Sequence, residues 1–301
     1  MTARALMYVL LIWGLAGCDH RATERQPPAD IAVHRGSDAR PNGEVSRRSV
    51  AIDGVTLSIL EGGSGDPIIF VHGVVTTSNI FPSYVRAYSP AYRGIAVDLR
   101  GYGDSQKPLT GFTIAQFSKD LVALADALQI QKPVWLGVSM GGMILQRLAL
   151  DHPDRVRALV LVSTTDGAMV LDKDLPSIGN GRDYREVSKT IIAESFPPGT
   201  PPSLYQPLLD RITTWNGTIL REALASMSQA NVHGQLFKIT VPTLIIVGAK
   251  DDVATPAIAR GIQAQIAGSQ LVEFNTGHFM MAEDPERFCT VLGDFLRTLP
   301  K

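Results

Sequence analysis

The chain has 301 residues, 45% of them apolar and 19% charged, so it can build a large core and does not have a disordered composition. One large domain is the default expectation for such a chain. The formal net charge is -1 and no long basic run occurs, which argues against nucleic acid as a partner.

The first 17 residues have the layout of a secretory signal peptide, with Arg4 ahead of an apolar stretch that gives way to a polar run. The apolar part spans about a dozen residues, short of the roughly 20 that a helix needs to cross a bilayer. The segment LAGC resembles a bacterial lipobox, which implies a lipoprotein whose mature chain begins at a lipidated Cys18. We therefore expect a protein of the bacterial cell envelope, anchored to a membrane on its periplasmic or extracytoplasmic side. An ordinary secretory signal that contains a cysteine is the alternative.

Residues 18–46 are rich in polar residues and proline without apolar periodicity, which predicts a flexible tether. Two apolar runs then flank Asp53-Gly54, a pair typical of a two-residue hairpin turn. Six continuous apolar runs follow, separated by segments with helical spacing: PIIFVHG, GIAVDLRG, PVWLGVS, ALVLVST, TLIIVGAKD and QLVEFNTGH. Continuous apolar runs indicate strands covered on both faces, and their alternation with helices predicts an α/β fold with a mainly parallel central sheet.

One interval interrupts this alternation of predicted strands and helices. Between residues 166 and 236 no buried strand is expected, and helix-like stretches are broken by the segment SFPPGTPPS. We interpret residues 166–236 as a helical cap inserted into a core made of residues 47–165 and 237–301. A cap over the edge of the sheet would exclude water and shape an apolar pocket.

The segment from Gly137 to Gly141 fits the pattern G-x-S-x-G between a predicted strand and a predicted helix. In that context Ser139 is expected on a strained, exposed turn as a nucleophile. Glycines suit the flanking positions because the turn brings backbone segments too close for a Cβ atom. The following helix is expected to stop before Pro153, with its N-terminal dipole directed at the site. A glycine-serine turn without catalysis is the alternative interpretation.

A serine hydroxyl needs a base to become a nucleophile, and His278, just past the last predicted strand, is the candidate. A carboxylate on the other ring nitrogen would orient the imidazole and complete a catalytic triad. Asp251 is the first choice, with Asp252 and Asp166 as alternatives. All of these residues follow predicted strands, and the carboxyl ends of parallel strands lie along one edge of a sheet, so they are expected to converge. The chain order Ser, Asp, His is the one expected for this architecture.

An acyl-transfer reaction also needs donors for the negative charge that develops on the carbonyl oxygen. The backbone N–H groups of Met140 and Val74 are the candidates for this oxyanion hole. Met140 directly follows the nucleophile, and Val74 follows the segment VHG on the loop after an earlier strand. His72 in that segment is expected to be structural.

Taken together, the segments VHG, DLRGYGDS, GVSMGG, VPTLIIVGAKD and GHFMMAEDPERF resemble the alpha/beta-hydrolase family over about residues 47 to 299. The groups that the chain looks most like are capped serine esterases, enol-lactone hydrolases and cofactor-free perhydrolases. Relatives that open epoxides or cleave carbon-halogen bonds carry an aspartate where this chain has Ser139, which disfavours those activities. In DLRGYGDS, we interpret Asp98 and Arg100 as polar groups of the scaffold.

The expected activity is hydrolysis of a small-molecule carboxylic ester through an acyl-enzyme, without a cofactor. A lactonase is the alternative within the same chemistry, and carbon-carbon bond hydrolysis, amide cleavage and perhydrolysis also remain open. A ligand-binding lipoprotein without catalysis is the alternative outside enzymes. The histidines show no metal-ligand spacing, so no metal is expected. The candidate residues of the substrate pocket, each of which can equally be core packing, are Ile80, Phe81, Met169, Trp215 and Phe279.

Overall fold

The computed structural model describes residues 44–89, 91–167, 184–210 and 217–300. Cys18, Met169 and Trp215 lie outside these ranges, as do the signal peptide and nearly all of the tether, so the predictions made for them stay predictions. Among the described residues, no helix combines the length and the apolar character needed to cross a membrane.

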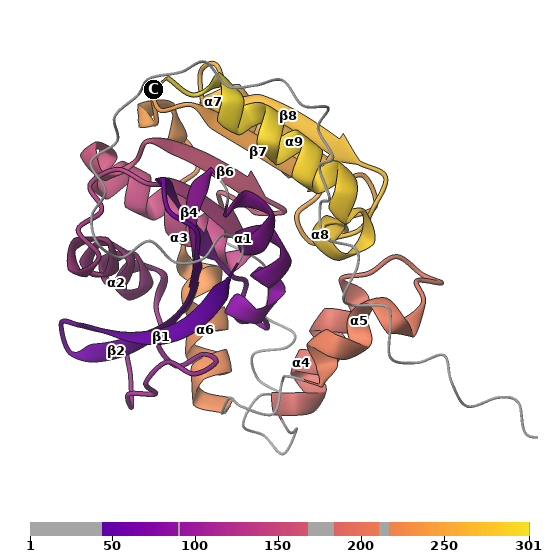
Figure 1. Ribbon diagram of the computed structural model, residues 1–301. Coiled ribbons are helices and arrows are strands. Elements are labelled where there is room, and N and C mark those ends of the chain that lie inside the picture. Colours follow the sequence, from indigo (N-terminus) through magenta and orange to yellow (C-terminus); the bar gives the residue numbers. More distant parts are fainter. Residues whose placement is uncertain (1–43, 90, 168–183, 211–216, 301) are drawn as a thin grey trace, which may run out of the picture.

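A single sheet organises the described residues, with its eight strands in the order β1-β2-β4-β3-β5-β6-β7-β8 (Figure 1). Strands β1 (Val45–Ile52) and β2 (Val55–Gly62) form the predicted hairpin, and Gly54 in its two-residue turn has a φ of 75°. Strand β2 also runs antiparallel to β4. The six continuous apolar runs are the parallel strands β3 (Asp66–Val71), β4 (Tyr92–Asp98), β5 (Val134–Val138), β6 (Ala158–Val162), β7 (Thr243–Gly248) and β8 (Gln270–Phe274). The predicted mainly parallel sheet is therefore confirmed.

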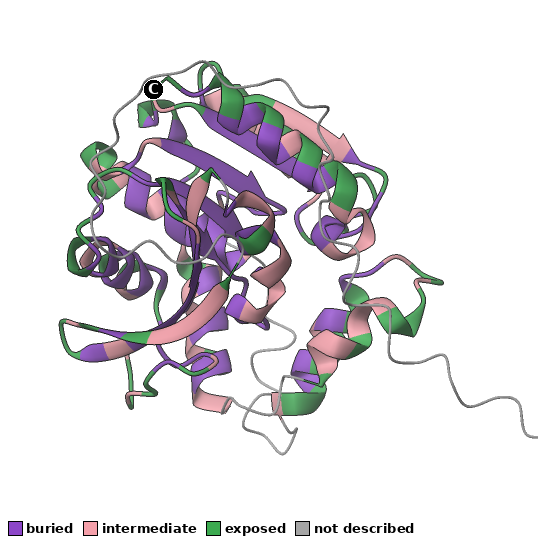
Figure 2. Cartoon of the chain, in the orientation of Figure 1, coloured by how far each residue is buried: buried purple, intermediate pink, exposed green. Residues whose placement is uncertain are grey.

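The sheet separates two apolar cores because successive side chains of a strand point to opposite faces. In β3, Ile69 and Val71 belong to one core, and Ile68 and Phe70 belong to the other. All four are fully buried, and the central strands are buried along their length in Figure 2.

Helices cover both faces of the sheet. The first core includes side chains of α2 (Ile114–Ala127), α3 (Met140–Asp151) and α7 (Pro256–Gln265). The second includes side chains of α1 (Pro82–Tyr88), α8 (Met280–Glu283) and α9 (Pro285–Thr298). Helix α3 ends at Asp151, ahead of Pro153 as predicted.

Three described helices lie between β6 and β7, within the segment predicted as a cap: α4 (Tyr184–Glu194), α5 (Pro202–Leu209) and α6 (Gly217–Gln229). Helices α4 and α5 stand together away from the sheet, with α5 close to α8 (Figure 1). Helix α6 packs against α2, where the Ile114 N–H donates to Ser226 Oγ over 2.9 Å. The loops at the carboxyl edge of the sheet therefore face elements contributed by this segment.

Candidate active site

Ser139 occupies a strained turn between β5 and α3. Its backbone has φ 53° and ψ -118°, a conformation that is uncommon for a residue other than glycine. The turn is held from both sides, because the Ser139 N–H donates to the Val162 carbonyl over 2.9 Å and the Thr164 hydroxyl donates to the Ser139 carbonyl over 2.8 Å. Strain of this kind persists only where the surrounding structure enforces it.

The glycines around Ser139 permit close approach of the backbone, as the sequence pattern predicted. A Cβ atom on Gly137 would lie 2.5 Å from the carbonyl carbon of Gly141. One on Gly141 would lie 2.4 Å from the carbonyl oxygen of Val71 in β3. The motif is thus required by the packing of α3 against the ends of two strands.

His278 and Asp251 form a buried pair. His278 Nδ1 lies 2.8 Å from Asp251 Oδ2, and their side chains are 5% and 0% exposed. The other carboxylate oxygen accepts the N–H groups of Val253 and Ala254, each over 2.9 Å. Burial acts to raise the pKa of Asp251, but the hydrogen bond and the charge of His278, together with the two backbone donors, outweigh it and lower this pKa. Asp251 is therefore ionised at neutral pH, and it holds the proton of His278 on Nδ1.

The two alternative acids have other surroundings. Asp252 is exposed at the rim of a cavity and makes no hydrogen bond with His278. Asp166 Oδ2 lies 2.8 Å from Nδ1 of His233 and accepts a hydrogen bond from Nε2 of Gln265 over 2.7 Å. Of the three aspartates weighed from the sequence, Asp251 is the one that contacts His278.

Ser139 and His278 line the same cavity. The structure describes both residues, and it has no hydrogen bond between the Ser139 hydroxyl and the His278 ring. In the absence of substrate, contacts between nucleophile and base are often longer than a hydrogen bond and tighten when substrate binds. Because Nδ1 is engaged by Asp251, Nε2 is the ring nitrogen that remains for the hydroxyl.

Val74 and Met140 offer two backbone N–H groups beside Ser139. Val74 lines the cavity, and Met140 is the first residue of α3. Neither N–H has an acceptor among the described residues. The Val74 loop is closed on itself, because the Gly73 N–H donates to Thr76 Oγ1 over 3.0 Å and the Thr76 N–H donates to the Gly73 carbonyl over 3.3 Å.

The His72 side chain holds this loop in place through hydrogen bonds. Its Nε2 accepts the Leu99 N–H over 3.1 Å, so its Nδ1 carries the proton and donates to the Gly73 carbonyl over 2.8 Å. Complete burial lowers the pKa of His72, although the nearby Asp98 carboxylate acts in the opposite direction. A neutral, fully buried His72 therefore has the structural role predicted for it.

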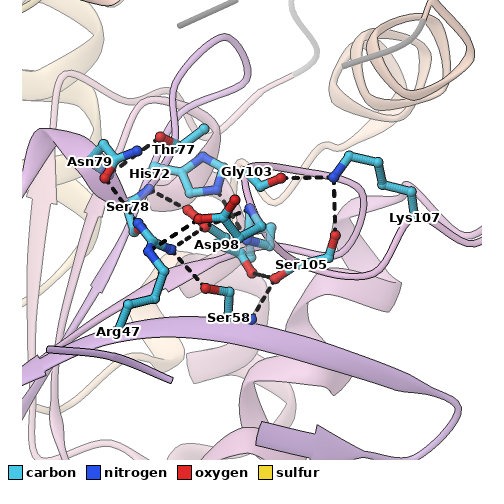
Figure 3. A network of polar contacts seen from close by, with 12 residues as sticks. Arg47, Ser58, His72, Thr77, Ser78, Asn79, Asp98, Gly103, Ser105 and Lys107 are labelled. Carbon is cyan, nitrogen blue, oxygen red and sulfur yellow. Dashed lines mark hydrogen bonds and ion pairs between the residues drawn. The ribbon is translucent and has the colours of Figure 1, made fainter. Parts of the chain in front are cut away.

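A second brace runs through Asp98, at the end of β4 (Figure 3). Its buried carboxylate accepts the Ser78 N–H over 2.7 Å and pairs with Arg47 Nη1 over 2.7 Å. Arg47 also donates to Asn79 Oδ1 over 2.9 Å and to Ser58 Oγ over 2.7 Å. This network ties the loop after β3 to β1, β2 and β4. Asp98 is thus a polar group of the scaffold, as the sequence indicated.

Arg100, in the loop after β4, is also a polar group of the scaffold. Its guanidinium pairs with the buried carboxylate of Asp120 on α2, with Nη2 donating to Oδ1 over 2.6 Å. The pair fastens the loop after β4 to the helix that follows it.

The cavity has a volume of about 980 Å³ and is lined on one side by the carboxyl edge of the sheet. Phe279, a predicted pocket residue, is part of its lining. The prediction for Ile80 and Phe81 needs correction, because both pack with the core on the opposite face of the sheet and neither lines the cavity. Phe81 is fully buried, with its ring centre 5.2 Å from that of Phe70.

The segment around Phe196, which lies within the predicted cap, contacts the loop that carries His278. The backbone N–H of His278 donates to the Ser195 carbonyl over 2.9 Å. The ring of Phe196 stacks on Phe279 with the ring centres 5.3 Å apart. A Cβ atom on Gly277 would lie 2.6 Å from Pro197 Cδ, so this position requires a glycine. Residues 195–197 and 277–279 therefore pack as one unit.

Sequence reasoning missed several of these contributors. The sequence marks the segment SFPPGTPPS only as an interruption between helices, although its Ser-Phe-Pro start contacts His278 and Phe279. It indicates Arg47 only as the first residue of the core. No local signal marks either one, because their importance comes from partners distant in the sequence.

The arrangement combines parts that acyl transfer uses. These are a hydroxyl, an imidazole, a buried carboxylate and two N–H groups without an acceptor in the described structure. Among the described residues, no group of three or more His, Cys, Asp or Glu side chains is placed to hold a metal ion.

Known proteins share this fold, and they match the greater part of the chain. A model of the alpha/beta hydrolase fold matches residues 66–201. The 3-oxoadipate enol-lactonase 2 of Acinetobacter baylyi is 28% identical over 244 residues, which cover 78% of this chain and 90% of the lactonase. The enol-lactonase from Burkholderia xenovorans superposes with a TM-score of 0.78 at 25% identity, over 83% of this chain and 100% of its own. An esterase from Exiguobacterium antarcticum superposes with a TM-score of 0.77 at 26% identity, over 83% and 99% of the two chains. This chain therefore has the alpha/beta-hydrolase fold, and enol-lactonases and esterases are among the proteins to which it is similar.

Proposed function

We propose that this protein is a serine hydrolase that cleaves a carboxylic ester through an acyl-enzyme. The observation that carries the proposal is the buried His278–Asp251 pair, which lines the same cavity as Ser139 on its strained turn. The strained turn places half-buried Ser139 in the lining of the cavity, and the pair presents Nε2 of the imidazole as the base.

In the proposed reaction, Ser139 Oγ attacks the carbonyl carbon of the ester while its proton moves to Nε2 of His278. The carbonyl oxygen becomes negatively charged and accepts the N–H groups of Val74 and Met140. The tetrahedral intermediate then breaks its bond to the alcohol oxygen, which leaves with the proton from His278. Ser139 now carries the acyl group as an ester.

The second half repeats these steps with water. His278 takes a proton from a water molecule, whose oxygen attacks the acyl carbon. The intermediate collapses, the proton returns to Ser139 Oγ, and a carboxylic acid leaves. Asp251 stays ionised throughout and stabilises the imidazolium that forms in each half.

A lactone is the second candidate substrate. The similarity to the enol-lactonases of Acinetobacter baylyi and Burkholderia xenovorans favours it. A lactone uses the same catalytic parts, because its leaving oxygen departs in the same way but stays attached to the acyl chain. Carbon-carbon hydrolysis, amide cleavage and perhydrolysis need the same nucleophile and differ in the pocket. A panel of esters, lactones and dienone-type substrates, tested on the purified protein, separates ester, lactone and carbon-carbon hydrolysis.

The direct test of the mechanism is labelling with a fluorophosphonate probe. We expect the probe to label Ser139 and the Ser139→Ala variant to lose both labelling and hydrolysis of a short 4-nitrophenyl ester. Circular dichroism of the variant controls for folding. A folded Ser139→Ala protein with full esterase activity would refute the mechanism. Tight binding of the ester without turnover by the wild-type protein would favour the alternative of a ligand-binding lipoprotein.

We also propose that the protein is held at the surface of a bacterial membrane through a lipid on Cys18. The support is the lipobox-like segment LAGC followed by a polar tether. Several acyl chains on one residue anchor a protein stably, since each buried CH₂ contributes about 0.8 kcal/mol. The test compares wild type with Cys18→Ser after cell fractionation. An unchanged membrane fraction in the variant excludes lipidation at this residue.

A further inference from the structure

The walls of the catalytic cavity are mainly apolar. Aromatic and aliphatic side chains from the predicted cap form a large part of them, among them Ile191, Phe196, Tyr205, Leu224 and Met227. From the core side, Phe279 adds a ring that stacks on Phe196. A volume of about 980 Å³ is at the upper end of what small-molecule pockets enclose, roughly 300–1,000 Å³. Such a cavity suits an ester with a long or bulky hydrocarbon part.

Two carboxylates belong to the same lining. Glu194 is the last residue of α4, on the cap side, and Asp252 lies on the loop after β7, next to Asp251. Both are exposed, so they stand at the opening of the cavity and not in its depth. Neither forms an ion pair with a described residue. Among the described residues that line the cavity, the charged side chains other than His278 are therefore both negative.

This charge discriminates against anionic substrates. A substrate carboxylate about 10 Å from each of the two side chains would be disfavoured about fourfold in water at low salt. The apolar walls deeper inside add to the discrimination, because they offer no compensation for the lost hydration of a charge. A neutral hydrocarbon chain incurs neither penalty.

We propose that the natural substrate is an uncharged, largely apolar ester or lactone, and that Glu194 and Asp252 select against carboxylate-bearing substrates. This inference rests on the proposed esterase or lactonase function. It also separates this chain from the enol-lactonase of Acinetobacter baylyi, whose name refers to 3-oxoadipate, a dicarboxylic acid.

The test uses two esters that differ in charge but share an acyl chain: methyl 4-nitrophenyl adipate, which is neutral, and 4-nitrophenyl hydrogen adipate, which is anionic at neutral pH. The quantity measured is the ratio of their kcat/KM values, divided by the ratio of their uncatalysed hydrolysis rates. We expect a ratio of about fourfold or more in favour of the neutral ester at low salt. At 1 M salt, where the screening length is about 3 Å, the ratio should fall to the part that desolvation by the apolar walls contributes.

The variant Glu194→Gln/Asp252→Asn should reduce this preference, chiefly by raising kcat/KM for the anionic ester. Glu186→Gln is the matched control, because Glu186 is another carboxylate on α4 that pairs with Lys189 and does not line the cavity. It should leave the preference unchanged. Equal kcat/KM values for the two esters in wild type, or an unchanged preference in the double variant, would overturn the inference.

A binding measurement separates failure of this inference from failure of the proposed function. The Ser139→Ala protein is titrated calorimetrically with N-(4-nitrophenyl)hexanamide and with N-(4-nitrophenyl)adipamate, its carboxylate analogue. Tighter binding of the neutral amide supports charge selection even when no ester is cleaved, an outcome that would refute only the hydrolase mechanism. Tighter or equal binding of the carboxylate analogue refutes charge selection, whatever the esterase assay shows.

Discussion

Replacing Asp251 by asparagine is the sharpest test of the proposed catalytic machinery. Asp251 accepts three N–H donors: Val253 and Ala254 at one oxygen, each over 2.9 Å, and His278 Nδ1 at the other over 2.8 Å. Asparagine has one carbonyl oxygen and one NH₂ group. If its oxygen keeps the two backbone donors, its NH₂ group faces His278 Nδ1.

The consequence is a change of tautomer. Nδ1 must then accept a hydrogen bond, which moves the imidazole proton to Nε2, and Nε2 can no longer take the proton of Ser139. In serine proteases the equivalent substitution lowers kcat by about 10⁴, which corresponds to about 5.5 kcal/mol of activation free energy. We expect a loss of similar size for Asp251→Asn, with the fold retained because the side chain keeps its shape and two of its three hydrogen bonds.

The assay is kcat and kcat/KM for a 4-nitrophenyl ester, together with circular dichroism and the midpoint of thermal unfolding. Asp252→Asn and Asp166→Asn are the controls. Each should retain a kcat for a neutral ester within about tenfold of wild type, because neither carboxylate contacts His278. A folded Asp251→Asn protein within tenfold of wild-type kcat, or a loss of about 10³ or more in one of the controls, would show that the acid has been assigned to the wrong residue.

Three further substitutions test the packing and charges around this site. Gly141→Ala places a Cβ atom 2.4 Å from the Val71 carbonyl oxygen, so we expect a loss of about 3 kcal/mol or a failure to fold, measured by urea unfolding. A wild-type unfolding midpoint for that variant would contradict the close packing of the turn at Ser139. Phe196→Ala removes a buried ring stacked on Phe279. It should lower the unfolding free energy by about 3 kcal/mol and raise KM for an apolar ester. An unchanged KM would mean that this wall of the cavity does not contact the substrate. Glu61 is buried, which acts to raise its pKa, but its pairs with Arg48 and Arg93 outweigh burial and lower the pKa below 4.5. Its ionised form therefore contributes stability above that value, which is lost as the pH falls through the lower folded-state pKa, so the stabilities of wild type and Glu61→Gln should converge in acid. A difference between the two proteins that persists at low pH would refute this account.

The sequence alone was sufficient for the strands and for the turn that carries Ser139. Each buried strand is a continuous apolar run because both of its faces are covered, and this is visible within five or six residues. The G-x-S-x-G pattern is equally local, since Gly137 and Gly141 both lie within two residues of Ser139 and their lack of a Cβ atom permits the strained turn. Burial and backbone conformation produce recognisable sequence patterns because they constrain the residue type at each position separately.

The choice among aspartates needed the tertiary structure. Asp251 and Asp252 are neighbours in the chain, and only the path of the loop after β7 turns one side chain towards His278 and the other to the rim of the cavity. The same limit explains the error at Ile80 and Phe81. Their apolar side chains suit a pocket and core packing equally, and the helical turn Ser78–Ile80 leads the chain to the opposite core, where Phe81 meets Phe70.

The contacts between residues 195–197 and 277–279 show why such features cannot be found from the sequence alone. The Ser195 carbonyl accepts the N–H of His278, 83 positions further along the chain, and nothing near either residue encodes the other. The sequence by itself determined which segments are buried strands and where a serine can be held under strain, because those properties arise from each segment's own side chains. The tertiary structure decided which carboxylate orients His278 and which side chains line the cavity, because these depend on how loops from distant segments meet at one edge of the sheet.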